Sequence, residues 1–319
     1  MSRLAAPAAA LAWLGGQGTR AIAAVVIVGI AVPPLGAVLK PYVPEAIFLL
    51  LTLAFVRVDP AVLLGHLRRP GLVLGATAWT MLAVPCLFGI VGMAIGLEAR
   101  APDLMLAVML QAVASPMMAA PAFAAVMGLD ATLVLVALVA SSILTPLTAP
   151  LFMSFFIGPA LTLSPLRLGV TLLGILAGSA ALGLILRRVV GAATIARRRR
   201  EIDGINILVV FVFVAAVMES VGPRLLVAPL TVLGLAALAF ATSFGVLALT
   251  VLVLRPAGRA RAFALGMMAS QRNMGLMLAA TGGALPDTVW VWFALCQFPI
   301  YLAPQLLTPL TRRLVVKPA

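Results

Sequence analysis

The chain has 319 residues, of which 64% are hydrophobic and 10% charged, and 22 basic against 9 acidic residues give a net charge of +13. A soluble globular domain is about 45–50% apolar and about 25% charged, so this chain has too few polar residues to coat a water-soluble surface. A water-soluble fold is therefore excluded, and the composition predicts an integral membrane protein whose partner is the lipid bilayer.

Long uncharged stretches predict membrane-spanning helices rather than the strands of a transmembrane barrel. Residues 131–157 carry no charge, whereas barrel strands alternate apolar and polar residues. A hydrocarbon core of about 30 Å needs about 20 apolar residues per helix. We therefore expect an all-α membrane protein with ten transmembrane helices, at 20–40, 44–58, 70–96, 103–128, 131–156, 165–187, 203–221, 227–254, 260–283 and 287–310.

The basic residues lie between the predicted helices and gather on one side, which argues against nucleic acid as a partner. The second side holds only Lys40, Arg100, Arg167 and Arg224, and Arg272 falls inside a helix. Short cytoplasmic loops carry the excess of lysine and arginine, so we expect both termini to lie on the cytoplasmic side. The membrane itself is expected to be a cell membrane, such as a bacterial inner membrane. The first side carries Arg3, Arg20, Arg57, Arg68, Arg69, Arg187, Arg188, Arg197 to Arg200, Arg255, Arg259, Arg261, Arg312, Arg313 and Lys317.

A short internal match divides the chain into two halves. The sequence Leu-Thr-Pro-Leu-Thr at 144–148 recurs at 307–311, and the two copies end the fifth and the tenth predicted helix. Because five is odd, the second half enters the membrane from the opposite side, which makes an inverted repeat. We expect a cytoplasmic leader at 1–19, a first five-helix repeat at 20–156, a second at 165–310 and a cytoplasmic tail at 311–319.

The fourth and ninth predicted helices both contain helix-breaking sequence near their middle. Ser115-Pro116 suits the start of a new helix, since serine caps free N–H groups and proline is tolerated at the first helical position. In the ninth helix the break is a polar cluster. Discontinuous helices place unpaired backbone groups at membrane mid-depth, where they hold ions or substrate. The predicted substrate site comprises Ser115, Pro116, Gln271, Arg272 and Asn273, with Gln111 and Gln297 either in reach of it or in helix-to-helix hydrogen bonds.

This layout resembles the bile acid:sodium symporter family. The specific likeness lies in Gln-Arg-Asn-Met-Gly-Leu at 271–276, which is similar to the family's ninth-helix signature, and in the Ser/Thr- and Pro-rich end of the fifth helix at 142–150. The resemblance implies ten helices in two inverted repeats, with the fourth and ninth broken and crossing. It also implies a panel of helices one, two, six and seven, and a core of the other six that moves relative to the panel.

The chain departs from the family at the positions that the resemblance assigns to sodium. Where sodium-using members carry oxygen ligands, this sequence has Pro121-Ala122 on the fourth helix and Val134 and Leu138 on the fifth. The expected glutamate falls near Met268, and the family's glutamine corresponds to Arg272. Apolar side chains offer sodium no oxygen, so the resemblance implies a relative that does not bind this cation.

Arg272 is the charged residue that falls deepest in a predicted helix. A central arginine costs about 2.5–3.5 kcal/mol on insertion scales, and it keeps its proton. Either its guanidinium points at the carbonyl ends of the broken helices and replaces a coupling cation, or it faces the cavity and pairs with an anionic group of the substrate. A misplaced helix boundary, which would leave Arg272 near the surface, is the third possibility.

The sequence carries no catalytic constellation and no metal or cofactor motif: neither a Walker loop, nor a Gly-x-Ser-x-Gly elbow, nor a His/Cys/Asp cluster. We expect a secondary transporter of a small organic anion, of the bile-acid or organic-acid type, that works by alternating access without sodium. The alternatives are a sodium- or proton-coupled symporter of the same family, an efflux carrier of the auxin-carrier type and, from other classes, a channel or a membrane receptor. The identity of the substrate and the oligomeric state stay open.

Overall fold

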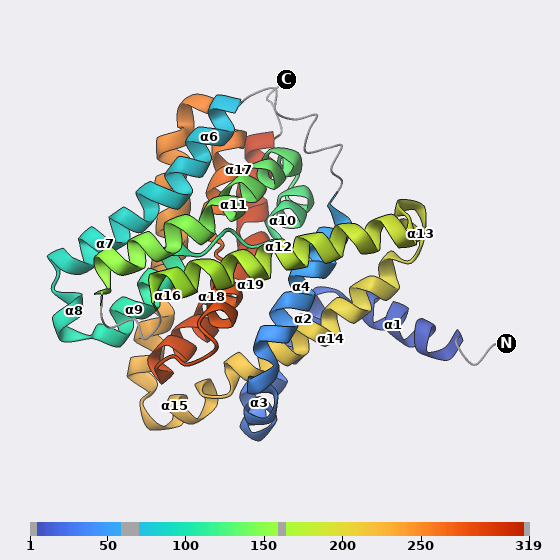
Figure 1. Cartoon of the computed structure of the whole chain (residues 1–319), viewed down its shortest axis with the longest axis horizontal. Coiled ribbons are helices and arrows are strands. Elements are labelled where there is room, and N and C mark those ends of the chain that lie inside the picture. The colour runs from blue at the N-terminus through green and yellow to red at the C-terminus, as the bar shows by residue number, and fades with distance from the viewer. Residues whose placement is uncertain (1–4, 59–69, 159–163, 316–319) are drawn as a thin grey trace. The chain divides into compact units, whose positions relative to one another are not determined.

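The computed structural model describes residues 5–58, 70–158 and 164–315, and within these ranges the chain is almost entirely helical (Figure 1). The predicted all-α membrane fold is confirmed at this level, because seven helices are long and apolar enough to cross a bilayer. The chain is therefore a multi-pass membrane protein. The seven are Pro33–Arg57, Pro70–Ala94, Ala131–Phe156, Pro165–Val190, Arg199–Val227, Pro229–Ala257 and Asp287–Thr311.

The structure corrects the helix expected at 20–40. Helix α1 (Ala5–Gln17) occupies most of the expected leader, and α2 (Thr19–Ala31) follows it directly. Pro33 and Pro34 then start a new helical stretch that runs to Arg57. The prediction treated Lys40 as the loop between two spans, but Lys40 begins η1 (Lys40–Tyr42) inside this helical stretch. Its Nζ is paired with Glu219 Oε2 at 3.0 Å. Of the predicted cytoplasmic residues, Arg3, Arg68, Arg69 and Lys317 lie outside the described residues.

The chain forms two compact units, and each unit takes segments from both halves of the sequence. Unit 1 comprises Met1–Val58, Leu173–Val232 and Leu278–Leu285. Unit 2 comprises Asp59–Leu172, Leu233–Met277 and Pro286–Ala319.

Unit 1 is assembled around α14 (Arg199–Met218), which packs against α1, α2, α3 (Pro33–Leu39) and α4 (Val43–Arg57). The contact with α1 requires two glycines, because a Cβ on Gly15 would overlap the carbonyl oxygen of Arg200 and a Cβ on Gly204 would overlap that of Leu11. The other helical elements of unit 1 are η1 (Lys40–Tyr42), most of α12 (Pro165–Val190), α13 (Ala192–Arg197), α15 (Val221–Val227), the start of α16 (Pro229–Leu254) and the end of α18 (Met274–Ala280).

Ion pairs at opposite ends of α14 fix the directions of its neighbours. Arg57 Nη2 lies 2.7 Å from Asp203 Oδ1 at one end, and Lys40 pairs with Glu219 at the other, so α4 is antiparallel to α14. Arg187 Nη1 donates to the carbonyl oxygen of Val56 at 3.3 Å, which brings the end of α12 to the end of α4. Basic residues that we expect on the same side of the membrane therefore meet at one end of unit 1.

Unit 2 contains the two interrupted helices and their supports. Helix α9 packs against α7, α11 and α19, and α11 packs against α6, α10 and α17. Between α6 and α7 the chain forms the π-helix η2, from which Trp79 Nε1 donates to Thr250 Oγ1 at 2.9 Å. The elements are α6 (Pro70–Ala78), η2 (Trp79–Ala83), α7 (Val84–Ala94), α8 (Leu97–Arg100), α9 (Pro102–Val113), α10 (Ala120–Val126), α11 (Ala131–Phe156), the start of α12, α16 from residue 233, η4 (Arg255–Ala257), α17 (Arg259–Ser270), the start of α18 and α19 (Asp287–Val315).

Candidate functional site

Both predicted interruptions are present in unit 2. Helix α9 ends at Val113, and the chain is non-helical until α10 begins at Ala120. Helix α17 ends at Ser270, and α18 begins at Met274. The prediction that the fourth helix restarts at Pro116 is wrong, because Pro121 provides the proline near the start of α10.

The two interruptions cross and pair through their backbones. The N–H of Met117 donates to the carbonyl oxygen of Gln271, and the N–H of Asn273 donates to that of Ser115, each at 2.8 Å. Pro116 and Arg272 face each other between these bonds in a single antiparallel bridge. The flanking residues make the hydrogen bonds in such a pair, so Pro116 has no need of the N–H that it lacks. Backbone groups that helix breaks would leave unpaired are thus satisfied at the crossing.

Asn273 also starts the second half of the ninth helix. Its Oδ1 accepts a hydrogen bond from the backbone N–H of Leu276 at 3.2 Å. Asn273 thus acts as the N-cap of α18, bonding the N–H three residues further along. Asparagine is among the residues preferred for this role. The side chain that sequence reasoning assigned to substrate therefore serves α18 in this structure.

Arg272 is buried, with 3% of its surface exposed, and its guanidinium donates to two main-chain carbonyls. Nη1 lies 3.0 Å from the oxygen of Ala114, the residue that follows α9, and Nη2 lies 3.1 Å from the oxygen of Thr80 in η2. The end of a helix leaves carbonyls without intrahelical partners and carries partial negative charge. The contact with Ala114 is that of the first possibility, a cation at the carbonyl end of a broken helix, whereas Thr80 lies inside a continuous helical stretch. The possibility that Arg272 lies at the surface is wrong.

Gln271 is fully buried, yet its side chain has no hydrogen-bond partner in the described part of the chain. Both Nε2 and Oε1 are unpaired, and the residue is 0% exposed. The hydroxyl of Thr77 in α6 shares this condition. A buried polar group left unsatisfied costs about 1–3 kcal/mol, so a donor and an acceptor from outside the described residues are expected at Gln271.

The other two predicted glutamines form hydrogen bonds within unit 2. Gln111 Oε1 accepts from Trp292 Nε1 at 2.9 Å and lies 3.6 Å from the Sγ of Cys296, so it links α9 to α19. Gln297 Nε2 donates to the carbonyl oxygen of Phe293, one turn earlier in its own helix. For Gln111 the helix-to-helix alternative is therefore confirmed.

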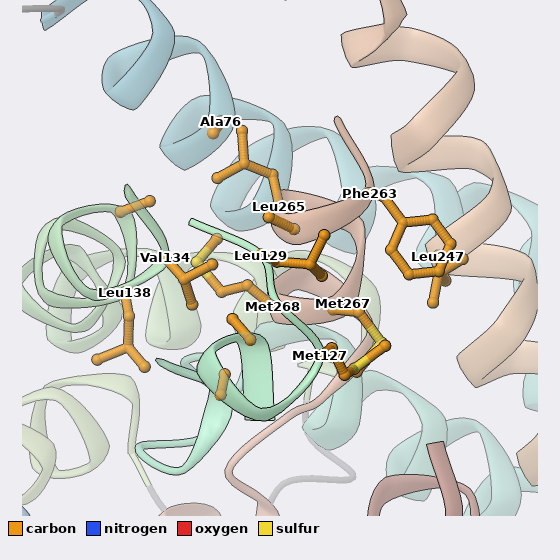
Figure 2. Close-up of a cluster of buried hydrophobic side chains, with 14 of the residues drawn as sticks. Ala76, Met127, Leu129, Val134, Leu138, Leu247, Phe263, Leu265, Met267 and Met268 are labelled. Atoms are coloured by element: carbon orange, nitrogen blue, oxygen red, sulfur yellow. The ribbon is translucent and has the colours of Figure 1, made fainter. Parts of the chain in front are cut away.

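Three of the positions that the resemblance assigns to sodium lie in a hydrophobic cluster, whereas Pro121 and Ala122 in α10 lie outside it. Val134, Leu138 and Met268 are each 0% exposed and pack with Leu265 and Met267 of α17 (Figure 2). Hydroxyls on the next turns of α11 are turned to the helix itself, since Ser141, Ser142 and Thr145 donate to carbonyls four residues earlier. Among the described residues no group of three or more His, Cys, Asp or Glu could hold a metal ion.

The partners of Arg272 were missed by sequence reasoning. Thr80 has no local signal, because the π-helix that contains it follows no simple sequence pattern. Ala114 is an ordinary apolar residue whose role comes only from its carbonyl oxygen. For Gln111, the sequence could suggest that the buried indole N–H of Trp292 needs an acceptor, but it does not show that Gln111 is that acceptor.

No model of a known protein family matches the chain, and the search of curated proteins gives no match either. The bile acid:sodium symporter family accordingly stays a prediction from the residues of the crossing. The function is therefore argued from the geometry of unit 2.

Proposed function

We propose that the protein is a secondary transporter that carries a small organic anion across the cell membrane by alternating access and without sodium. The observation that carries this proposal is the backbone bridge between two interrupted helices, with Arg272 opposite Pro116. Irregular backbone at membrane depth is tolerated where it is buried in protein or lines a cavity. In transporters with inverted repeats, the crossing of such helices is the place where substrate and ions bind.

The organisation of the chain supports this mechanism. In the proposed ten-helix repeat, α9–α10 and α17–α18 are equivalent broken helices, and α11 and α19 are equivalent final helices. The panel of helices one, two, six and seven draws on nearly the same sequence segments as unit 1, and the core draws on those of unit 2. Two units, each with its own internal packing, are what a rocking mechanism requires.

Sodium independence is supported by what surrounds the crossing. Sodium is bound by oxygen ligands, and Val134, Leu138 and Met268 provide only apolar surface. The carbonyl oxygens of Ala114 and Thr80 already receive the guanidinium of Arg272. We propose that this fixed positive charge holds the broken helix in place, as a bound cation does in the sodium-using relatives.

The charge of Arg272 also supports an anionic substrate. Its hydrogen-bond partners are neutral carbonyls, and no carboxylate of the described residues forms an ion pair with it. The positive potential at the crossing is thus not cancelled locally, and low-dielectric surroundings extend its reach. We propose that the substrate anion sits in this field and hydrogen-bonds to the free amide of Gln271, beside the backbone of Ser115, Pro116 and Asn273.

The proposed orientation rests on the basic end of unit 1. Arg57, Arg187 and Arg199 meet there, with Asp203 between Arg57 and Arg199. Lys40 lies at the opposite end of α14 and is paired with Glu219. Because cytoplasmic loops carry the excess of basic residues, we propose that the basic end and both termini face the cytoplasm.

Uptake into proteoliposomes tests the proposal. A thermal-shift screen with bile salts, keto acids and other organic acids first identifies an anion that stabilises the purified protein. Uptake of that anion should then follow its own gradient and stay unchanged when sodium is replaced by choline. If a sodium gradient raised the uptake rate by about tenfold or more, a factor typical of coupling between two bound ligands, sodium independence would be overturned. Channel-like single-channel currents would overturn the transporter itself.

A pair of variants tests the role of the charge in substrate binding. Arg272→Gln should weaken the binding of the anion, whereas Arg259→Gln, the same change at the exposed start of α17, should leave it unchanged. Equal binding by Arg272→Gln and the wild type would show that the guanidinium has no part in selecting the substrate.

A further inference from the structure

Unit 2 carries an open apolar groove of about 520 Å³ that the transport proposal does not use. The groove is lined by residues of α7, α8, α9 and α16 and of the turn after α7. The single hydroxyl of its lining belongs to Thr242, which donates to the carbonyl oxygen of Ala239 three residues earlier. The lining residues are Leu87, Phe88, Val91, Gly92, Ile95, Leu97, Leu104, Val108, Leu238, Ala241, Thr242, Gly245, Val246 and Leu249.

Hydrocarbon is the occupant that this lining admits. A bound water needs two to four polar partners, and the groove offers none beyond a hydroxyl already bonded to its own helix. An empty groove would forfeit the dispersion contacts of its walls. Helices α7 and α16 belong to membrane-crossing stretches, so the surrounding solvent is itself made of acyl chains.

A positive charge stands at the α8 end of the groove. Gly96 lies between Ile95 and Leu97 of the lining, and the Nε of Arg100 is 3.9 Å from the point that a Cβ of Gly96 would occupy. Arg100 is exposed, and no described carboxylate forms an ion pair with it. It is also one of the four basic residues on the side of the membrane that basic residues avoid.

We propose that this groove binds one acyl chain of a membrane phospholipid whose phosphate is held by Arg100. The planar guanidinium fits phosphate with two parallel hydrogen bonds. From Leu87 to Ile95 the lining follows α7 for about 12 Å, at a rise of 1.5 Å per residue, so the groove takes the part of the chain nearest the headgroup. The proposal requires only that these helices lie in a bilayer and does not depend on transport.

A matched pair of glycines in α16 allows a sharp test. Gly245 lines the groove, and a Cβ added there would meet no heavy atom within 4 Å, so Gly245→Leu adds a side chain to the lining without a clash at its Cβ. Gly234 is equally open and lies in the same helix but outside the lining, so Gly234→Leu is the control. Arg100→Gln tests the headgroup contact separately.

The measurement is native mass spectrometry of the full chain in detergent, titrated with phosphatidylglycerol that carries palmitoyl and oleoyl chains. The wild type and Gly234→Leu should each retain one lipid, and Gly245→Leu should retain none. Arg100→Gln should bind about tenfold more weakly, the loss of one charged hydrogen-bond partner. Glycerol phosphate, which has the headgroup phosphate without the chains, should neither bind nor compete.

Three outcomes would overturn the proposal. Gly245→Leu could retain the lipid as the wild type does, or Gly234→Leu could lose it equally. A dimer that Gly245→Leu alone dissociates would show that a second copy of the chain covers the groove. If Gly245→Leu does not fold, Ala241→Phe blocks the same groove from another lining position, and the same criteria apply.

Discussion

The backbone N–H of Asn273 donates to the carbonyl oxygen of Ser115, which ties the break in the ninth helix to the break in the fourth. With the bond from Met117 to Gln271, this pairing uses main-chain groups alone, so it survives substitution of the side chains. The two interrupted helices are therefore joined within unit 2 by bonds that need only a backbone N–H at Met117 and Asn273, which every residue except proline supplies. The side chains of Gln271 and Arg272 are then free to be tested for binding and stability.

Replacing Arg272 should expose a cation dependence. In Arg272→Gln the carbonyl oxygens of Ala114 and Thr80 lose their donors, and each buried unsatisfied group costs about 1–3 kcal/mol. We expect Arg272→Gln to have a lower melting temperature than the wild type in choline chloride. In sodium chloride of equal ionic strength, part of this loss should be recovered. Thermal denaturation in detergent measures both, with Arg259→Gln as the control. A variant as stable as the wild type in choline would contradict the fixed-cation role.

Replacing Gln271 should separate stability from transport. Because both polar atoms of its side chain are buried and unpaired, Gln271→Leu removes an unsatisfied amide and should leave the melting temperature unchanged or raised. Anion uptake into proteoliposomes should fall strongly in the same variant. A variant that keeps full uptake would remove Gln271 from the proposed site.

The bond between Gln111 and Trp292 should stabilise the contact of α9 with α19. Gln111→Leu leaves the buried indole N–H without its acceptor and should lower the free energy of unfolding by about 1–3 kcal/mol. The double variant Gln111→Leu/Trp292→Phe should lose less free energy of unfolding than the sum of the losses in the two single variants. A double-mutant cycle of denaturation in detergent measures this coupling. Strict additivity would mean that the two side chains do not interact.

The close approach of α1 to α14 should depend on Gly204. In Gly204→Val the new side chain overlaps the backbone of Leu11, so α1 must move away or the unit must lose stability. Gly174→Val in α12 is the control, because a Cβ there meets no heavy atom within 4 Å. Thermal denaturation in detergent should give a lower melting temperature for Gly204→Val than for Gly174→Val. Equal melting temperatures for the two variants would show that α1 does not dock on α14 in this manner.

The two helix breaks could be predicted because each contains a local signal. One interruption falls at Ser115-Pro116 and the other at the polar cluster of the ninth helix. Proline alone is not sufficient, because Pro146 and Pro150 lie inside the continuous α11. The restart of the fourth helix was misplaced because two prolines could serve as its first turn, and the bridge to Arg272 holds Pro116 in an extended chain. The choice between Pro116 and Pro121 thus depends on a segment more than 150 residues away.

The first helix and the partners of Arg272 could not be predicted for a similar reason. Lys40 looks like a loop residue until Glu219 is known to lie beside it. The acceptors of Arg272 are main-chain oxygens, and every residue carries one. Their selection follows from the π-helix and from the end of α9, which place two carbonyls at the same guanidinium.

Unit 1 is built from segments that are far apart in the chain and are therefore synthesised at different times. Helices α1 to α4 leave the ribosome well before α14, the element on which all of them pack. Until then Gly15, Gly36 and the charged side chain of Lys40 face lipid or water instead of their final neighbours. In a nascent chain that stops before residue 199, helices α1 to α4 should therefore lack stable tertiary packing. Such a chain should be more susceptible to quality-control proteases than the full-length protein.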